Sequence, residues 1–284
     1  MNTSVLVSIV TYNPDINVIK DTVQKCMQNN ITVYIFDNNS NNYGKLKEIT
    51  YLYNNVVVDT KNKNMGIAYA LNAIFSFGKK ELYDWVITLD QDSKITDEFL
   101  MKYSVSINKF ENNNEVAIIC PKIIDENVNK IIFGGEDEYE ELKDPEDLIT
   151  SGSCIKVLAW DKVGGFYNEL FIDFVDTDFQ QKILLNSYKI IRCNRITLFH
   201  KVGNAKDIKI GKWIIHCSNH NSFRRYYMVR NRLYFYRKYY GKFAYYKSLI
   251  RLIMGTFKII LFEDEKITKS RALLKGVKDY KELL

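Results

Sequence analysis

The chain has 284 residues, of which 46% are hydrophobic and 26% charged, proportions typical of a soluble globular protein with a substantial core. Its five cysteines are scattered and form no C-x-x-C pair, which argues against a disulfide framework and predicts reduced thiols in the cytosol. No uncharged stretch approaches the ~20 residues that span a bilayer, and no signal peptide is recognisable at the N-terminus.

Charge divides the chain into two parts. Residues 1–200 carry 20 Lys/Arg against 28 Asp/Glu, whereas residues 201–284 carry 20 against 6. An acidic body followed by a basic tail indicates that the two parts meet different partners.

The first 120 residues alternate strand-like and helix-like patterns. Alternation of this kind predicts an α/β fold with a mainly parallel sheet flanked by helices. Residues 134–150 are acidic and loop-like, a helix is expected near Asp176, and the chain beyond about residue 205 is expected to be helical. The expected early elements are strands at Val5–Thr11, Ile31–Phe36, Val56–Val58, Trp85–Leu89 and Val116–Cys120, and helices at Ile16–Gln28, Gly66–Phe77 and after Thr96.

Two acids one residue apart, Asp90 and Asp92, follow the apolar run Trp85–Leu89. A buried strand that ends this way places both carboxylates at the carboxyl edge of the sheet, where open α/β folds bind ligands. Mn²⁺ or Mg²⁺ commonly lies between such carboxylates and a substrate diphosphate. His200 ends another apolar strand and is a third candidate ligand. The alternative is an acidic turn without a metal.

Polar residues also follow the first two strands, as Thr11-Tyr12-Asn13-Pro14 and Asp37-Asn38-Asn39-Ser40. The chain has no G-x-G-x-x-G and no Walker sequence, so a Rossmann dehydrogenase or a P-loop enzyme is not expected. Side chains at this edge could hold a nucleoside, with Asp37 accepting a pyrimidine N–H. The alternative is that they are ordinary turn residues.

Three acids, Asp173, Asp176 and Asp178, surround the expected start of a helix among Phe171, Phe174 and Phe179. Partial desolvation by the rings would raise a carboxylate pKa towards the range of a general base. The alternative is simple capping of the helix.

In this order these motifs resemble the family 2 glycosyltransferases of the GT-A fold, and among them the bacterial rhamnosyltransferase-like branch. The resemblance runs from Ser8 to about Tyr240. Besides the stretches quoted above, it depends on Asn64-Met65-Gly66-Ile67-Ala68 with Asn72, Thr150-Ser151-Gly152, Gly164-Gly165-Phe166, and Arg224-Arg225-Tyr226-Tyr227 followed by Arg230-Asn231.

The resemblance implies an inverting, metal-dependent transfer of a sugar, with Asp176 as the catalytic base. It assigns the metal to Asp92, with Asp90 and His200 beside it. Lys182 departs from the arginine that the family often has after the base. The residues implied for the nucleotide sugar are Thr11, Asn13, Asp37, Gly66, Asn72 and Asp90, and those implied for the acceptor side are Ser151, Gly152, Asp173, Arg224 and Arg230.

The tail is rich in aromatic and basic residues: eleven aromatics fall between Phe223 and Tyr246, interleaved with arginines and lysines. This composition suits an anionic membrane surface. Packing on the catalytic domain and a homodimer through the C-terminal region are the alternatives. A single-stranded nucleic-acid binding module is a rival from another class, but the acidic body and the D-x-D argue against nucleic acid.

The sequence therefore predicts a catalytic domain at residues 1–204, with a nucleotide-sugar half at about 1–120 and an acceptor half at about 121–204, and a helical basic region at 205–284. The expected donor is dTDP-rhamnose, and the expected acceptor is a hydroxyl of a lipid-linked or oligosaccharide precursor of a cell-surface polysaccharide such as capsule or O-antigen. UDP-galactose, UDP-galactofuranose or another hexose donor is the alternative, and a nucleotidyltransferase is a more distant one. The expected place is the cytoplasm, peripheral on the inner face of the bacterial plasma membrane.

Overall fold

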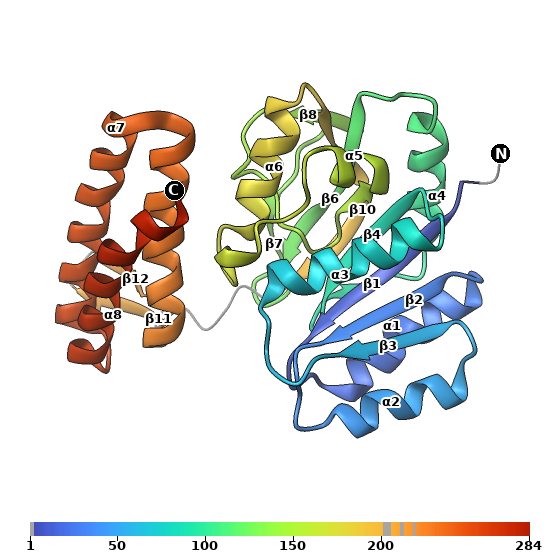
Figure 1. The fold of residues 1–284 in the computed structure, drawn as a ribbon, viewed down its shortest axis with the longest axis horizontal. Helices are drawn as coiled ribbons and strands as arrows, with labels where there is room; N and C mark the ends of the chain where they lie inside the picture. Colours follow the sequence, from blue (N-terminus) through green and yellow to red (C-terminus); the bar gives the residue numbers. More distant parts are fainter. Residues whose placement is uncertain (1–2, 201–205, 211–212, 218–219) are drawn as a thin grey trace. The chain divides into compact units, whose positions relative to one another are not determined.

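The computed structural model describes residues 3–200, 206–210, 213–217 and 220–284 (Figure 1). Its contacts divide the chain into two units. The first unit comprises residues 1–168 and 176–201, and the second comprises residues 169–175 and 202–284. The short segment 169–175 therefore belongs with the C-terminal helices, although its sequence neighbours on both sides belong to the first unit.

The first unit is built on a mixed, mainly parallel ten-stranded sheet. The path of strands is β3-β2-β1-β4-β9-β6-β10-β5, with β7 beside β6 and β8 beside β10. Strands β1, β2, β3 and β4 pair in parallel, β6 and β10 pair in parallel, and β9 runs antiparallel between β4 and β6. The strands are β1 Val5–Thr11, β2 Thr32–Asp37, β3 Val56–Thr60, β4 Trp85–Asp90, β5 Lys94–Ile95, β6 Val116–Asp125, β7 Lys130–Phe133, β8 Tyr139–Leu142, β9 Cys154–Lys156 and β10 Lys189–His200.

Helices cover both faces of this sheet, as the alternating sequence predicts. Val7 and Ile9 of β1 pack in one apolar cluster with residues of α1, α2 and α4. Leu6 points to the opposite face of the sheet, where it lies near Gly78 of α3. The helices of the first unit are α1 Ile16–Gln28, α2 Tyr43–Leu52, α3 Ile67–Lys80, α4 Phe99–Phe110, α5 Val157–Lys162 and α6 Val175–Leu185.

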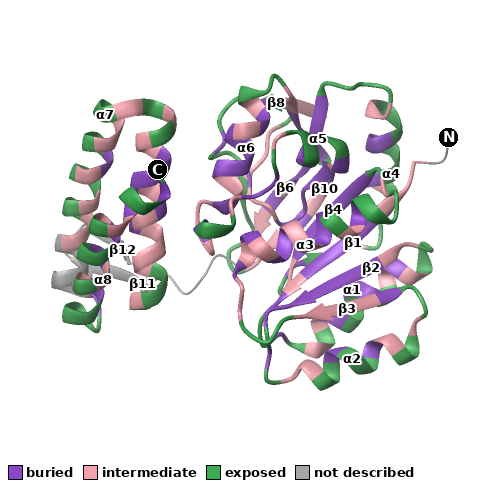
Figure 2. Cartoon of the chain, in the orientation of Figure 1, coloured by how far each residue is buried: buried purple, intermediate pink, exposed green. Residues whose placement is uncertain are grey.

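The core lies on the central strands, whose residues are buried along most of their length (Figure 2). β4 is buried from Trp85 to Leu89 and becomes partly exposed only at Asp90. Helix α1 begins after Asp15, whose side chain caps it by accepting a hydrogen bond from the Asn17 N–H at 2.9 Å.

The second unit is largely helical. Helix α7, Ser222–Phe262, turns back at Gly241, where φ is 78° and ψ is −166°, so that its two halves form a hairpin. The halves are joined by a hydrogen bond of 3.0 Å from Arg232 Nε to Ser248 Oγ. Helix α8, Lys266–Asp279, packs on this hairpin through Leu273, against Val229 and Leu233.

Three regions differ from the sequence-based expectation. The region from residue 205 was expected to be helical, and it is so in α7 and α8, but it begins with a β-hairpin of β11 Lys206–Ile210 and β12 Trp213–Cys217. The expected loop 134–150 contains β8, which pairs with β10. Helix α2 follows the Asn-rich turn without having been predicted, because it buries only Leu46 and Ile49.

Candidate active site

The carboxyl ends of β1, β2 and β4 lie side by side in the sheet, as parallel pairing requires. Thr11 pairs in register with Asp37, and Val10 with Asp90. The polar residues that end these three strands therefore meet at one edge, which is the arrangement that the sequence predicts.

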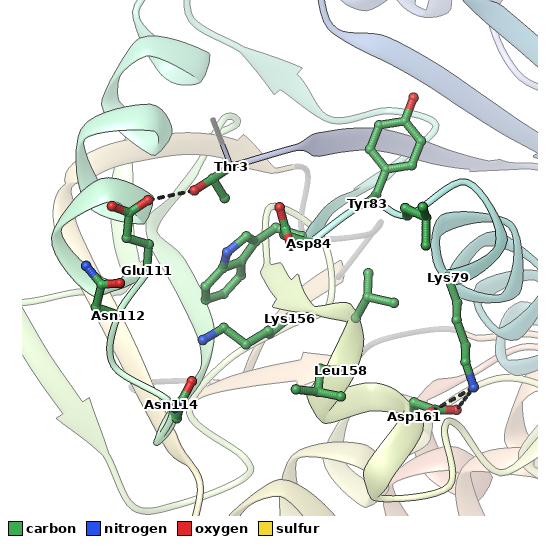
Figure 3. Close-up of a pocket in the computed structure, with 13 residues that line it drawn as sticks. Thr3, Lys79, Tyr83, Asp84, Glu111, Asn112, Asn114, Lys156, Leu158 and Asp161 are labelled. Carbon is green, nitrogen blue, oxygen red and sulfur yellow. Dashed lines mark hydrogen bonds and ion pairs between the residues drawn. The ribbon is translucent and has the colours of Figure 1, made fainter. Parts of the chain in front are cut away.

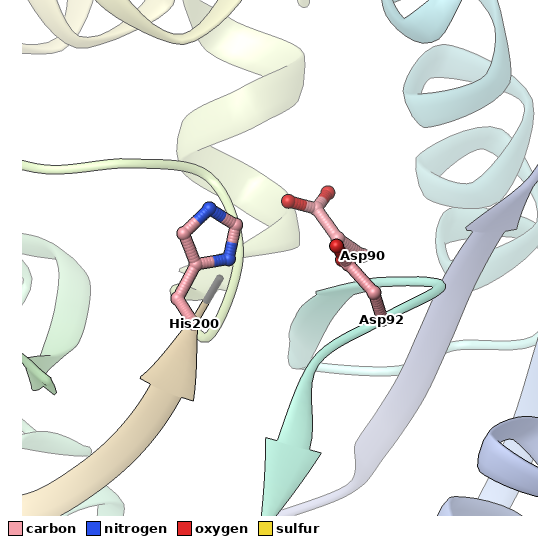
Figure 4. A group of neighbouring side chains, drawn as sticks. All are labelled: Asp90, Asp92 and His200. Carbon is pink, nitrogen blue, oxygen red and sulfur yellow. The ribbon is translucent and has the colours of Figure 1, made fainter. Parts of the chain in front are cut away.

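Asp90, Asp92 and His200 converge at this edge (Figure 4). One oxygen of each carboxylate and one nitrogen of the imidazole all lie within 4.8 Å of one another. The Nδ1 atom of His200 is buried and has no hydrogen-bond partner within the described residues. Two carboxylates and an unpaired imidazole nitrogen are ligands that fit a divalent cation.

Ser151 and Gly152 form hydrogen bonds with the backbone of β4 next to the D-x-D. The Ser151 hydroxyl is 1% exposed, accepts a hydrogen bond from the Asp90 N–H at 3.1 Å and lies 2.6 Å from the Ser93 hydroxyl. The Gly152 N–H donates to the Thr88 carbonyl at 2.6 Å. The structure thus gives both residues a role in holding the end of β4.

Gln91, which the sequence analysis did not single out, joins the D-x-D to the end of β1. Its side-chain oxygen accepts a hydrogen bond of 2.7 Å from the Tyr12 N–H. Its place between Asp90 and Asp92 was the available signal, but the contact across 79 residues is visible only in the fold.

Asp37 is the centre of a buried hydrogen-bond network at the end of β2, near the D-x-D. Its carboxylate accepts hydrogen bonds from the Thr11 hydroxyl at 2.8 Å, the Ser40 N–H at 2.8 Å and the Ser40 hydroxyl. Asp37 is 0% exposed, so its carboxylate is closed to a nucleoside base in this conformation. Asn13, with φ of 51°, donates from its N–H to Ser40 Oγ at 2.7 Å and is exposed at the rim.

Gly66 and Asn72 differ in what they offer a ligand. Gly66 precedes α3 with φ of 84°, a conformation that favours glycine, and its N–H donates to Asn64 Oδ1 at 2.9 Å.

The Asn72 side chain forms hydrogen bonds with the loop that contains Gly164-Gly165-Phe166 and with Trp160 before it. Its oxygen accepts from the Trp160 indole at 3.0 Å and the Phe166 N–H at 2.9 Å, and its nitrogen donates to the Phe166 carbonyl at 2.8 Å. We therefore infer that Asn72 fixes that loop and does not bind the nucleotide sugar.

Asp176 lies in the first turn of α6 and is partly exposed, whereas Asp178 is 0% exposed. The Asp176 carboxylate accepts a hydrogen bond of 2.9 Å from the Thr177 N–H. Lys182 pairs with Asp178 at 3.3 Å and donates to the Gly165 carbonyl at 3.0 Å. Lys182 therefore links α6 to the glycine loop. Of the two acids in the first turn of α6, Asp176 is the partly exposed one.

The other predicted acceptor-side residues belong to the second unit. Arg224 Nη2 pairs with Asp173 Oδ1 at 3.1 Å, and Arg224 Nε donates to both oxygens of that carboxylate at 3.3 Å. Arg230 donates to the Glu169 carbonyl, and its guanidinium lies 4.7 Å from the ring centre of Tyr227. Both arginines hold the segment 169–175 in this structure.

A separate pocket lies at the amino-terminal end of β4, away from the carboxyl ends of the strands (Figure 3). Trp85 and Lys156 line it, with the Lys156 ammonium 5.0 Å from the indole ring. Lys79 and Asp161 close one side with an ion pair of 2.7 Å. Because Asp90 ends the strand that Trp85 begins, this pocket is not part of the D-x-D site.

Comparison with known proteins decides the family. The model of glycosyl transferase family 2 matches residues 6–155, more than half of the chain. The chain belongs to glycosyltransferase family 2. A dTDP-rhamnosyl transferase of Shigella flexneri, RfbF, is 29% identical over 250 residues, which cover 84% of this chain and 81% of that protein. The region that the family model matches contains the D-x-D and the strand ends that precede it.

Solved structures of similar fold are also glycosyltransferases. TarS of S. aureus aligns with a TM-score of 0.56 and 17% identity over 71% of this chain and 37% of its own. GalNAc-T7, solved with UDP, GalNAc and Mn²⁺, aligns with a TM-score of 0.58 and 18% identity over 82% of this chain and 50% of its own. The chain thus spans only part of these two structures, and at such identities they establish the GT-A fold alone.

Proposed function

We propose that this family 2 glycosyltransferase transfers L-rhamnose from dTDP-rhamnose, with inversion, to a hydroxyl of a cell-surface polysaccharide precursor. The convergence of Asp90, Asp92 and His200 within 4.8 Å carries the proposal. These side chains are ligands that can hold a divalent cation against the diphosphate of a nucleotide sugar. The likeness to a dTDP-rhamnosyl transferase over most of both chains supports rhamnose before other sugars.

Asp90, Asp92 and His200 would hold Mn²⁺ or Mg²⁺. When bound there, the cation supplies positive charge that neutralises the departing diphosphate. The nitrogen ligand of His200 favours Mn²⁺, because Mg²⁺ is held mainly by oxygen. Asn13, which is exposed, remains our candidate for the nucleotide. Thr11 and Gly66 are buried like Asp37, which acts by fixing Thr11 and the turn that contains Ser40.

Asp176 takes the proton from the acceptor hydroxyl. The oxygen then forms its bond to the anomeric carbon from the face opposite the diphosphate, and the electron pair of the breaking C–O bond leaves with the diphosphate. A single displacement through an oxocarbenium-like transition state inverts the configuration at that carbon. Asp176 suits this task because it is partly exposed in the first turn of α6, while its neighbour Asp178 is buried.

A donor panel tests the proposed reaction. dTDP-rhamnose, UDP-galactose, UDP-galactofuranose and another UDP-hexose would be titrated into the enzyme by calorimetry, with Mn²⁺ and with excess EDTA. The account predicts the tightest, Mn²⁺-dependent binding for dTDP-rhamnose. Tighter binding of a UDP-hexose would refute the donor while leaving the family intact, and equal binding with EDTA would refute the metal.

We further propose that the second half of α7 contacts an anionic membrane. Five large apolar side chains with helical spacing are each at least half exposed: Phe243, Tyr246, Ile250, Ile253 and Met254. Exposed Lys242, Lys247 and Arg251 accompany them, so one helix offers apolar surface and positive charge together. The alternating residues Tyr245, Leu249 and Leu252 pack inside the second unit. No helix within the described residues is long and apolar enough to cross a bilayer.

Vesicle sedimentation separates the membrane from its rivals. The double variant Phe243→Ser, Ile250→Ser should lose binding to phosphatidylserine vesicles at low salt, whereas Leu82→Ser, which alters an 82% exposed residue of the first unit, should not. Wild-type protein that ignores these vesicles but sediments as a dimer, or binds an oligonucleotide instead, would contradict the proposal.

A further inference from the structure

The segment Glu169–Val175 belongs to the second unit, yet it ends immediately before Asp176, which belongs to the first. Three non-glycine residues in it have left-handed backbone conformations: Phe171 at φ 62°, Asp173 at φ 61° and Phe174 at φ 61°. Each of these conformations costs free energy that other contacts must offset. The contacts come from the first half of α7.

Asn231 is the centre of these contacts. It is 0% exposed, and its amide nitrogen lies 2.8 Å from the carbonyl oxygens of Leu170, Ile172 and Asp173. Its oxygen accepts a hydrogen bond of 3.0 Å from Arg230 Nε, which fixes the amide with its nitrogen facing the segment. One side chain therefore holds three of the seven carbonyl groups of the segment.

Side chains of the segment are held as well. The Arg224 guanidinium binds the Asp173 carboxylate through two nitrogens, as described above. The Phe171 ring stacks on Tyr227 with 5.1 Å between centroids and 19° between planes, and it meets the edge of Phe223. Phe174 lies 5.5 Å from Phe235, centroid to centroid. The residues on both sides of these contacts belong to the second unit.

We propose that Asn231 is a positioning residue for the catalytic base. By fixing the carbonyls of residues 170, 172 and 173, it sets the left-handed turns through which the chain enters α6, and thereby the direction of the first turn, which carries Asp176. The inference rests on the proposed function, in which Asp176 takes the acceptor proton. It also gives the C-terminal helices a task in the reaction that is separate from membrane contact.

The variant Asn231→Asp keeps the size of the side chain and replaces the donating amide with an oxygen that repels the three carbonyls. The expected result is a fall in kcat of about 10²-fold, the loss expected when a catalytic group is misplaced by about 1 Å, with the Mn²⁺-dependent affinity for dTDP-rhamnose unchanged. Hydrogen exchange at the amides of residues 170–176 should accelerate in the same variant. Ser248→Ala is the control, because Ser248 is 2% exposed and bonds Arg232 in α7 without touching the segment.

Arg224→Gln is the second variant, chosen because the Arg224 side chain is 44% exposed and its loss leaves the core of α7 intact. A positioning role predicts a lower kcat, whereas direct acceptor binding by Arg224 predicts a higher acceptor KM with kcat unchanged, which would overturn the inference. If Asn231→Asp has the same kcat as Ser248→Ala while Asp176→Asn abolishes transfer, Asn231 is not a positioning residue, and Asp176 is still the base. If Asp176→Asn transfers normally, the proposed base fails and the inference with it.

Discussion

Replacement of Gly152 by alanine tests how tightly the end of β4 is supported. Gly152 has φ of 81°, and a Cβ atom there would lie 2.7 Å from Pro121 Cγ and 2.9 Å from Leu198 Cδ2. The left-handed conformation costs about 1–2 kcal/mol for an L-residue, and overpacking of a dense core costs about 1–3 kcal/mol more. Because the Pro121 ring is rigid, the backbone at Gly152 must move, and with it Ser151, which holds the Asp90 N–H.

We therefore expect Gly152→Ala to lower the free energy of unfolding by about 2–5 kcal/mol and to weaken Mn²⁺-dependent donor binding. Urea unfolding followed by tryptophan fluorescence measures the first effect, and calorimetry measures the second. Gly44→Ala is the matched control, since no atom lies within 4 Å of its would-be Cβ and it is in helix α2; it should be neutral or stabilise by up to about 1 kcal/mol. A Gly152→Ala protein within about 0.5 kcal/mol of wild type, with normal donor binding, would refute this account of the strand end.

Three further predictions concern side chains that are buried or fully paired. Asn72→Leu should reduce stability by at least about 2 kcal/mol, because Phe166 and Trp160 lose their partners; a stable variant that binds donor poorly would return Asn72 to the nucleotide site. Burial raises the pKa of Cys26 and of Cys120 to about 12, so a thiolate-directed reagent at pH 8 should label neither until urea is added; rapid labelling of the native protein would contradict their burial. Burial alone would raise the pKa of Glu263, but Lys269 at 3.0 Å and Arg225 at 2.6 Å outweigh it and hold that pKa below its usual value. The stabilisation by Glu263 is therefore present above about pH 4.3 and is lost as pH falls through the lowered pKa, so wild type and Glu263→Gln should converge in stability at acid pH and diverge at pH 7.

The sequence predicted the sheet and the D-x-D site because both depend on local patterns. Trp85–Leu89 is apolar along its length, and parallel strands bring Thr11, Asp37 and Asp90 to the same edge without further information. His200 was expected near the metal by resemblance, and the structure places its ring beside the two acids.

The roles that the sequence did not predict depend on distant partners. Asn72 meets Phe166 across 94 residues and Ser151 meets Asp90 across 61, separations at which no local pattern carries information. The assignment of residues 169–175 to the C-terminal unit has the same cause, since Asn231 binds carbonyl groups that leave no trace in the sequence. The β11–β12 hairpin is different, because the alternation of Lys206-Asp207-Ile208-Lys209-Ile210 was a strand signal that the basic, aromatic composition obscured.

The central claim, that Asp92 binds the cation required by the donor, is tested most directly by calorimetry of Asp92→Asn. Loss of a residue that only supports a metal ligand costs about 10–100-fold in metal affinity, so loss of a ligand should lower Mn²⁺-dependent donor affinity by at least about 10-fold. Asp97→Asn, in which a 91% exposed acid nearby is neutralised, should bind donor as wild type does. Equal, Mn²⁺-dependent affinity in wild type and Asp92→Asn would contradict the account.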